Sequence, residues 1–310
     1  MALQYLLWLQ SFREATGGAL NSFFLIVSAS LNIYAVAIPC FIYWCVSKKR
    51  GAFVILNLIT VSMGMETLKA TVCELRPWIR FPQIHPVVTA SGYSFPSGHA
   101  SIAAAIFGTT ALLWRKKLFI VIPCMAMILL VGFSRNYLGV HTPQDVLCGF
   151  ALGASAICVN AWLLRWSADN SRRETVVTLL YILASFAMIF YAANKTYPPV
   201  FINGKPAVDP ARFLNAACFV CGGVNGFFAG LFLEKRLVNF SIDGGALKKT
   251  LRFTAGFALF FLLASVTKTP LASADPNLWK ALCGAMTAIY VTALYPYIFS
   301  RIERLCEKYM

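Results

Sequence analysis

Long apolar runs separated by short polar segments make up most of this chain. Nine such runs occur, and each approaches the length of about 20 residues with which a helix crosses a bilayer. The pattern predicts an all-α protein, a polytopic membrane bundle of about nine transmembrane helices. The runs lie approximately at residues 21–46, 52–73, 98–114, 118–134, 145–164, 175–193, 212–233, 251–269 and 278–299.

The composition supports a membrane protein. Hydrophobic residues make up 59% of the 310 positions and charged residues only 13%, which is atypical of a soluble domain of this length. We find no linker or repeat, and we therefore expect a single membrane domain over residues 1–310. Residues 5–9 are apolar but too short to span, and they predict a short helix at the membrane interface.

Basic residues are concentrated in every second segment between the apolar runs. The net charge of +15 could suit a nucleic-acid-binding protein, but five regions hold 17 of the 27 Lys and Arg residues. This alternation is the positive-inside pattern of multi-pass membrane proteins, so we expect no nucleic-acid partner. It predicts a cytoplasmic C-terminus and an N-terminus outside. The five regions contain Lys48, Lys49, Arg50; Arg115, Lys116, Lys117; Arg165, Arg172, Arg173; Lys235, Arg236, Lys248, Lys249, Arg252; and Arg301, Arg304, Lys308.

Three short polar signatures fall at the predicted outer ends of the apolar runs, all within residues 69–145. Ionisable groups are expensive in a membrane and are functional by default. Together the signatures supply three cations, two imidazoles, a carboxylate and a hydroxyl, which suit the binding of a phosphate and the cleavage of its ester. They read Lys69-x6-Arg76-Pro77, Pro96-Ser97-Gly98-His99 and Ser134-Arg135-x5-His141-x3-Asp145.

The first signature predicts two cations on one helix face. Lys69 and Arg76 are seven residues apart, which corresponds to about 10.5 Å along a helix axis. Pro77 is expected to end that helix at or near Arg76. Arginine binds phosphate oxygens as a fork and lysine as a point charge. The alternative is a pair of snorkelling interface cations, which the depth of Lys69 in its apolar run disfavours.

The second signature stands where a helix is predicted to begin. Ser97 has the character of an N-cap, and the free backbone N–H groups of the first turn favour an anion. Gly98 would let a phosphate approach the backbone closely. His99 would then be placed to protonate a leaving oxygen as a general acid. An ordinary cap followed by an interfacial histidine is the alternative.

The third signature also opens a helix, with Thr142 as N-cap and Pro143 at the first helical position. Asp145 lies in the first turn and can reach back to a ring nitrogen of His141, which would orient that imidazole as the acid of a triad does. The alternative for Asp145 is a capping-box residue. Arg135 adds a third cation.

The three signatures resemble those of the type-2 phosphatidic acid phosphatase superfamily. That group includes lipid phosphate phosphatases, bacterial phosphatidylglycerophosphate and polyprenyl diphosphate phosphatases, sphingosine-1-phosphate phosphatases, glucose-6-phosphatase and vanadium haloperoxidases. Every motif position is present, and residues 91–99 and 139–145 are particularly similar to bacterial members. The resemblance covers about residues 50–165. We therefore expect a catalytic core at about 20–165 and a C-terminal helical extension at about 175–300.

The resemblance implies a role for each motif residue. His141 would attack phosphorus and form a phosphohistidine, Asp145 would orient it, and His99 would protonate the leaving alcohol. No metal or other cofactor is implied, and no carboxylate cluster of the kind that holds magnesium lies near the signatures. The phosphoryl oxygens would be held by Lys69, Arg76, Ser97, Gly98 and Arg135.

The substrate remains open at this stage. The expected reaction is hydrolysis of the phosphomonoester of a lipid phosphate at the outer membrane face. A sugar phosphate and a polyprenyl diphosphate are alternatives, and a catalytically silent binding or transport protein is a third class. Membrane lipids and the substrate are the expected partners, and no obligate protein partner is evident. The expected location is a bacterial cytoplasmic membrane with a periplasmic site, or the endoplasmic reticulum with a lumenal site in a eukaryote.

The outer segment 194–211 contains four prolines, Pro198, Pro199, Pro206 and Pro210. Proline fixes the backbone and removes a hydrogen-bond donor, so this segment is expected to be stiff and irregular. Both a plain connector and a cover over the site are compatible with the pattern, and the connector is the simpler interpretation.

Overall fold

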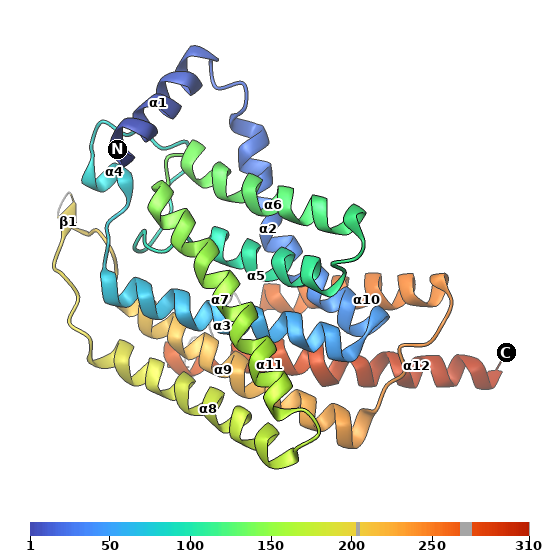
Figure 1. The fold of residues 1–310 in the computed structure, drawn as a ribbon. Helices are drawn as coiled ribbons and strands as arrows, with labels where there is room; N and C mark the ends of the chain where they lie inside the picture. The colour runs from blue at the N-terminus through green and yellow to red at the C-terminus, as the bar shows by residue number, and fades with distance from the viewer. Residues whose placement is uncertain (203–204, 267–274, 310) are drawn as a thin grey trace. The chain divides into compact units, whose positions relative to one another are not determined.

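The computed structural model describes residues 1–202, 205–266 and 275–309. Within these residues the chain is almost entirely helical, apart from one two-stranded antiparallel ribbon (Figure 1). The elements are α1 (Ala2–Ala15), α2 (Asn21–Phe41), the π-helical turn η1 (Ile42–Val46), α3 (Lys48–Val72), α4 (Pro77–Arg80), α5 (Gly98–Leu113), α6 (Leu118–Tyr137), α7 (Pro143–Ser167), α8 (Ser171–Asn194), β1 (Phe201–Ile202), β2 (Lys205–Pro206), α9 (Ala211–Leu233), η2 (Glu234–Val238), α10 (Ala246–Val266), α11 (Pro276–Ile289), η3 (Tyr290–Leu294) and α12 (Tyr295–Tyr309).

The all-helical prediction is confirmed for the described residues. Seven helical segments there are long and apolar enough to cross a membrane. Helix α5 is apolar but only 16 residues long, and α10 is not among the seven. The predicted runs coincide with helices, although the last three residues of run 251–269 lie outside the described residues. The short helix predicted near residues 5–9 is present as α1.

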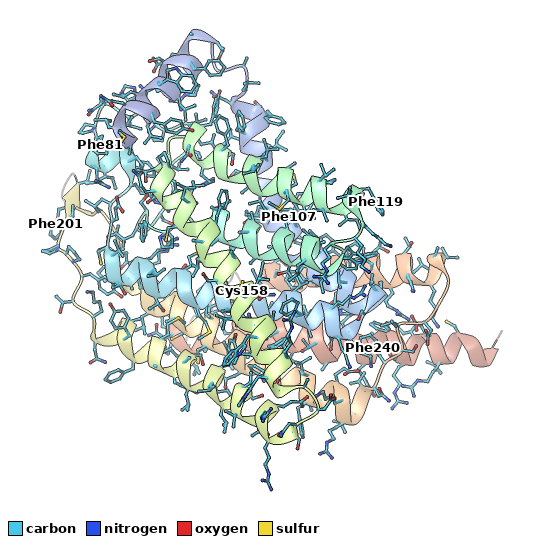
Figure 2. All side chains as sticks on the ribbon, viewed as in Figure 1. Phe81, Phe107, Phe119, Cys158, Phe201 and Phe240 are labelled. Carbon is cyan, nitrogen blue, oxygen red and sulfur yellow. The ribbon has the colours of Figure 1, made fainter. Side chains whose placement is uncertain are left out.

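Large apolar side chains face outward along the predicted spans. Phe119 at the start of α6 is 74% exposed, whereas Phe107 of α5 is 5% exposed (Figure 2). Exposed apolar surface of this extent would be unstable in water and is suited to a hydrocarbon environment. Together with the run of apolar helices, it indicates an integral multi-pass membrane protein.

The chain forms two compact units. Unit 1 comprises residues 1–36, 56–163 and 194–213, and unit 2 comprises residues 37–55, 164–193 and 214–310. Every residue of the three signatures lies in unit 1. The sequence was compatible with segment 194–211 being either a plain connector or a cover over the site. This segment belongs to the same unit as the signatures.

Glycines allow α5 and α7 to approach closely in unit 1. A Cβ atom at Gly149 would lie 2.8 Å from the carbonyl oxygen of Ser97, and one at Gly153 would lie 2.5 Å from Cβ of Ala104. These two glycines are four residues apart and lie on one face of α7, as in the small-residue motifs of membrane helix pairs. The close approach sets the start of α5 beside the start of α7.

Polar side chains join α3, α5 and α7 in the interior of unit 1. Asn160 donates through Nδ2 to Asn57 Oδ1 and to Thr60 Oγ1, both at 2.8 Å. Asn57 in turn donates through Nδ2 to Thr109 Oγ1 at 3.1 Å. These interhelical hydrogen bonds satisfy amides that are fully buried.

Helix α1 holds the loop before the second signature. Arg13 donates to the carbonyl oxygen of Tyr137 at 3.0 Å and also to that of His85. Gln10 accepts a hydrogen bond from the backbone N–H of His85 at 2.8 Å. His85, the one histidine outside the signatures, therefore lies in a structural contact between α1 and this loop.

Unit 2 is held by close helix packing and by aromatic side chains. A Cβ atom at Gly222 would lie 1.9 Å from the carbonyl oxygen of Ala281, so α9 and α11 nearly touch there. Trp44 donates through Nε1 to the carbonyl oxygen of Val291 at 2.8 Å, and its ring lies 4.7 Å from that of Tyr295. None of the predicted site residues belongs to this unit.

Candidate active site

The structure corrects the geometry predicted for the first signature. Helix α3 ends at Val72, and Cys73 adopts a left-handed conformation with φ +53°. Arg76 has an extended backbone (φ −61°, ψ 151°) because the following Pro77 disfavours the helical region. Lys69 and Arg76 therefore do not share one helix face: Lys69 lies in the last turn of α3, and Arg76 lies in the segment that follows.

Arg76 is held by backbone carbonyl groups on both sides of the site. Its Nε donates to the carbonyl oxygen of Gly92 at 3.0 Å and its Nη2 to that of Ser91 at 3.0 Å. Its Nη1 donates to the carbonyl oxygen of Val140 at 3.1 Å and lies 2.7 Å from Nε2 of His141. The guanidinium group, 4% exposed, is thus fixed directly against the ring of His141.

The hydrogen bonds of His141 determine its tautomer. A guanidinium group can only donate, so Nε2 of His141 is an acceptor. The proton of the neutral ring is therefore on Nδ1, which lies 3.3 Å from Oδ2 of Asp145. Burial lowers the pKa of His141 well below its ordinary value of 6.5, although the hydrogen bond to Asp145 opposes this shift. The imidazole is neutral at pH 7 and presents a lone pair on Nε2.

Asp145 has the geometry for both roles that the sequence left open. Its Oδ2 accepts from the backbone N–H of Thr142 at 2.7 Å, while its own N–H donates to Thr142 Oγ1 at 3.3 Å. This reciprocal pair is a capping arrangement at the start of α7. The same Oδ2 also faces Nδ1 of His141, so the helix cap holds the carboxylate in place for the imidazole.

Ser94 is a site residue that the sequence analysis did not assign. Its Oγ donates to Oδ2 of Asp145 at 2.6 Å and lies 3.3 Å from Nδ1 of His141. Ser94 is 1% exposed. The one sequence feature that could have indicated a role for Ser94 is its position in residues 91–99, three residues before Ser97.

The second signature begins α5, as predicted. Ser97 is the N-cap, with its hydroxyl 3.5 Å from the N–H of Ala100, and its own N–H donates to the carbonyl oxygen of Asp145 at 2.9 Å. A Cβ atom at Gly98 would lie 3.5 Å from Nζ of Lys69, so this helix start adjoins the lysine. His99 is partly exposed and lies within electrostatic range of Lys69, Arg76 and Arg135.

Arg135 completes the set of predicted cations. It is 5% exposed and donates through Nη1 to Ser28 Oγ of α2, a contact that the sequence analysis did not predict. Its Nε is buried and has no hydrogen-bond partner within the described part of the chain. A buried guanidinium with spare donors can bind an anionic oxygen.

The structure thus brings all eight predicted residues into one region of unit 1. Arg76 contacts the neutral His141 with its carboxylate partner, and Arg135 acts on the same ring. Lys69 adjoins the start of α5 and lies within electrostatic range of both arginines. Among the described residues, no group of three or more His, Cys, Asp or Glu side chains is arranged to hold a metal ion. The arrangement can bind a polyanion next to a nucleophilic nitrogen.

Comparisons with known proteins find a family match over the part of the chain that contains the three signatures. Residues 50–172 match the PAP2 superfamily. Residues 218–308 match a second family, described as PAP2 superfamily phosphatase, transmembrane extension. The two matches together cover both the signatures and the C-terminal helices.

Several curated proteins are similar over shorter stretches. Phosphatidylglycerophosphatase B of Bacillus subtilis is 40% identical over 89 residues, which are 26% of this chain and 44% of that protein. Undecaprenyl-diphosphatase of Sulfolobus acidocaldarius is 31% identical over 112 residues, 35% of this chain and 52% of that protein. Lipid A 1-phosphatase of Rhizobium johnstonii is 39% identical over 61 residues, 20% of this chain and 24% of that protein.

The chain spans about half the length, or less, of these relatives. No solved structure matches it. The chain nevertheless carries a PAP2 superfamily domain at residues 50–172, which includes the three signatures, and the transmembrane extension of PAP2 superfamily phosphatases at residues 218–308.

Proposed function

We propose that this protein is a metal-independent membrane phosphatase that hydrolyses the phosphomonoester of a lipid phosphate through a phosphohistidine. One observation carries the proposal. The buried, neutral His141 is held between Asp145 at Nδ1 and Arg76 at Nε2, so a phosphoryl group bound by Arg76 would have its phosphorus next to the Nε2 lone pair.

The proposed reaction has two steps. In the first, the hydrogen bond of Arg76 Nη1 passes from Nε2 of His141 to a phosphoryl oxygen, Nε2 bonds to phosphorus, the bond to the alcohol oxygen breaks, and His99 gives that oxygen a proton. In the second, water attacks phosphorus, gives a proton to His99, and releases inorganic phosphate with the neutral imidazole. Two easier displacements replace one difficult one.

The cations stabilise the charge that develops on the phosphoryl oxygens. Arg76, Lys69 and Arg135 are nearly fully buried, and electrostatic interactions are stronger in such a site than in water. The backbone N–H groups at the start of α5, with Ser97 and Gly98, add donors for the same oxygens. Asp145 stabilises the imidazolium character that His141 gains during the attack.

We propose a lipid as the carrier of the phosphate. The relatives described above are named as lipid phosphate or lipid diphosphate phosphatases. A site among membrane helices suits a substrate whose tail stays in the bilayer. Every signature residue is present, which disfavours a silent scaffold.

We further propose the predicted topology, with nine spans, the N-terminus outside and the C-terminus in the cytoplasm. This places the signatures at the outer face of the membrane, the periplasmic side in a bacterium. Residues 1–310 would form one membrane domain, with a catalytic core at about 20–165 and a helical extension at about 175–300.

The proposed reaction is tested by replacing His141. Purified protein is assayed, with and without EDTA, for phosphate release from phosphatidate, phosphatidylglycerophosphate, sphingosine-1-phosphate, undecaprenyl diphosphate and glucose-6-phosphate. We expect hydrolysis of a lipid substrate by the wild-type protein and a loss of at least about 10³-fold in kcat for His141→Ala, as for other nucleophile replacements.

The matched control is His85→Ala, because the ring of His85 lies in the contact with α1, with Nδ1 3.2 Å from Nε2 of Gln10. This variant should retain activity. Hydrolysis by His141→Ala would contradict the nucleophile assignment, and loss of wild-type activity in EDTA would contradict the metal-independent reaction.

A further inference from the structure

Arg212 is a fourth cation at the site, contributed from a distant part of the chain. It lies in the first turn of α9, beyond residues 50–172 and before residues 218–308, so neither family match includes it. Its Nη1 is buried and has no hydrogen-bond partner among the described residues. Arg212 belongs to unit 1 with the signatures.

The guanidinium of Arg212 rests directly on Gly92. A Cβ atom at Gly92 would lie 1.8 Å from Nη1 and 2.7 Å from Cζ of Arg212, so only glycine leaves space for this contact. Gly92 also has φ +75°, which favours glycine on conformational grounds. The carbonyl oxygen of the same glycine accepts from Nε of Arg76. Arg76 and Arg212 therefore meet at one residue of the loop.

A stack of aromatic rings holds Arg212 in this position. The ring of Phe213 lies between Tyr93 and Tyr197, with centroids 5.2 Å and 5.1 Å away and planes within 15° of parallel. Phe213 is 2% exposed. Because Phe213 follows Arg212 and Tyr93 follows Gly92, the stack joins the two segments beside the guanidinium.

Arg76 and Arg212 differ in their relation to His141. Arg76 lies 2.7 Å from Nε2 of His141, whereas Arg212 is placed by its contact with Gly92 and is not among the charges that act on His141. The charge of Arg212 acts on both Lys69 and Arg76. Mutual repulsion among these cations disfavours the empty site, and an anionic ligand relieves it.

The nearby carboxylates do not neutralise this cluster. Glu66 and Asp145 supply two negative charges against the four positive charges of Lys69, Arg76, Arg135 and Arg212, which leaves a formal excess of 4 − 2 = +2. Oδ2 of Asp145 is already occupied by Ser94, Thr142 and His141. The excess suits a ligand with more than one negative charge.

We propose that Arg212 binds a second anionic group of the substrate, adjoining the phosphoryl group that His141 attacks, and so narrows the lipid phosphate of the proposed function to a diphosphate ester, from which the leaving group is the phosphomonoester rather than the alcohol. This inference rests on the proposed function of the same site. Arg212 is a specificity-determining residue in this scheme, whereas Arg76 binds the phosphoryl group that is transferred.

The test measures binding, which does not require turnover. Titration calorimetry compares inorganic phosphate with methylenediphosphonate, a diphosphate analogue that is not hydrolysed, on the full-length wild-type protein in detergent. Arg212→Gln should weaken binding of methylenediphosphonate by about tenfold or more, because a hydrogen bond to a charged group typically contributes this much. Its binding of phosphate should change by less than about threefold. Arg212→Lys, which keeps the charge but loses the fork, should be intermediate.

Lys195→Gln is the matched control, since it removes a cation from the same segment, 194–213, that is not among the charges acting on Lys69 or Arg76. It should bind both ligands as the wild-type protein does. An equal loss of affinity for both ligands in Arg212→Gln, or no loss for either, would overturn the proposal. Hydrolysis of lipid phosphates by the same preparations tests the reaction itself, so failure of the reaction and failure of this inference give different results.

Discussion

At the scale of single residues, the state of His141 is set by its neighbours. Arg76 occupies the lone pair of Nε2 and Asp145 faces Nδ1, which together select one tautomer. Burial keeps the ring neutral by lowering its pKa. Arg76 thus both orients the imidazole and, with burial, favours an unprotonated Nε2, whereas Asp145 orients the ring but opposes the lowering of its pKa.

Ser94 should matter for catalysis through Asp145. Ser94→Ala removes a 2.6 Å hydrogen bond to a buried carboxylate, and such bonds contribute about 1.5–3 kcal/mol. We expect kcat on a lipid phosphate to fall about tenfold to a hundredfold, with a smaller change in KM. Ser91→Ala is the control, because only the backbone carbonyl of Ser91 contacts Arg76. A kcat within twofold of wild type for Ser94→Ala would refute this positioning role.

At the scale of helices, the site depends on how closely α5 and α7 approach. The start of α5 carries Ser97 and Gly98, and the start of α7 carries Asp145. The N–H of Ser97 donates to the backbone carbonyl of Asp145, so the two helix starts are joined directly. The glycines of α7 make this junction possible, because larger side chains would separate the helices.

Gly153→Ala should destabilise unit 1. Its new Cβ atom would lie 2.5 Å from Cβ of Ala104 and 3.0 Å from backbone atoms, which cannot move independently of α5. Overpacking of this kind costs about 1–3 kcal/mol, so the apparent Tm in detergent should fall by several degrees. Gly108→Ala is the control, because its Cβ atom would meet only the flexible ends of Ile157 and Ile128. Equal Tm values for the two variants would contradict the close-packing argument.

At the scale of the whole molecule, the number of membrane crossings depends on α5 and α10. Seven segments of the described chain meet the length and hydropathy expected of a span, whereas α5 has 16 residues. A helix of that length covers about 24 Å, slightly less than a typical hydrocarbon core. The loop that follows α5 lies on opposite sides of the membrane depending on whether α5 crosses it.

An epitope inserted after Lys116 in the full-length chain tests the crossing of α5. With nine spans and the N-terminus outside, this loop lies in the cytoplasm and should be labelled by antibody only after permeabilisation. A tag at the N-terminus is the accessible control, because its side does not depend on α5, and a tag at the C-terminus should be protected if all nine spans cross. Labelling of the Lys116 insertion in intact cells would show that α5 does not cross.

Local features of the site were predictable from sequence. The cap at Ser97, the helix start at Pro143 and the reach of Asp145 to His141 each involve residues within about one helical turn. Such contacts follow from backbone geometry, whatever the rest of the chain does. The prediction that Lys69 and Arg76 lie on one helix was wrong, because α3 ends before Cys73, which adopts a left-handed conformation.

The sequence alone determined the helical membrane architecture, the family and the set of charged groups, because hydrophobic length and short-range spacing are properties of neighbouring residues. Tertiary structure decided that Arg76 is anchored by loop carbonyls, that Ser94 holds Asp145, and that Arg212 joins a cluster whose other cations precede it by 77 residues or more. Contacts between distant segments depend on helix packing and aromatic stacking, and no local pattern encodes them.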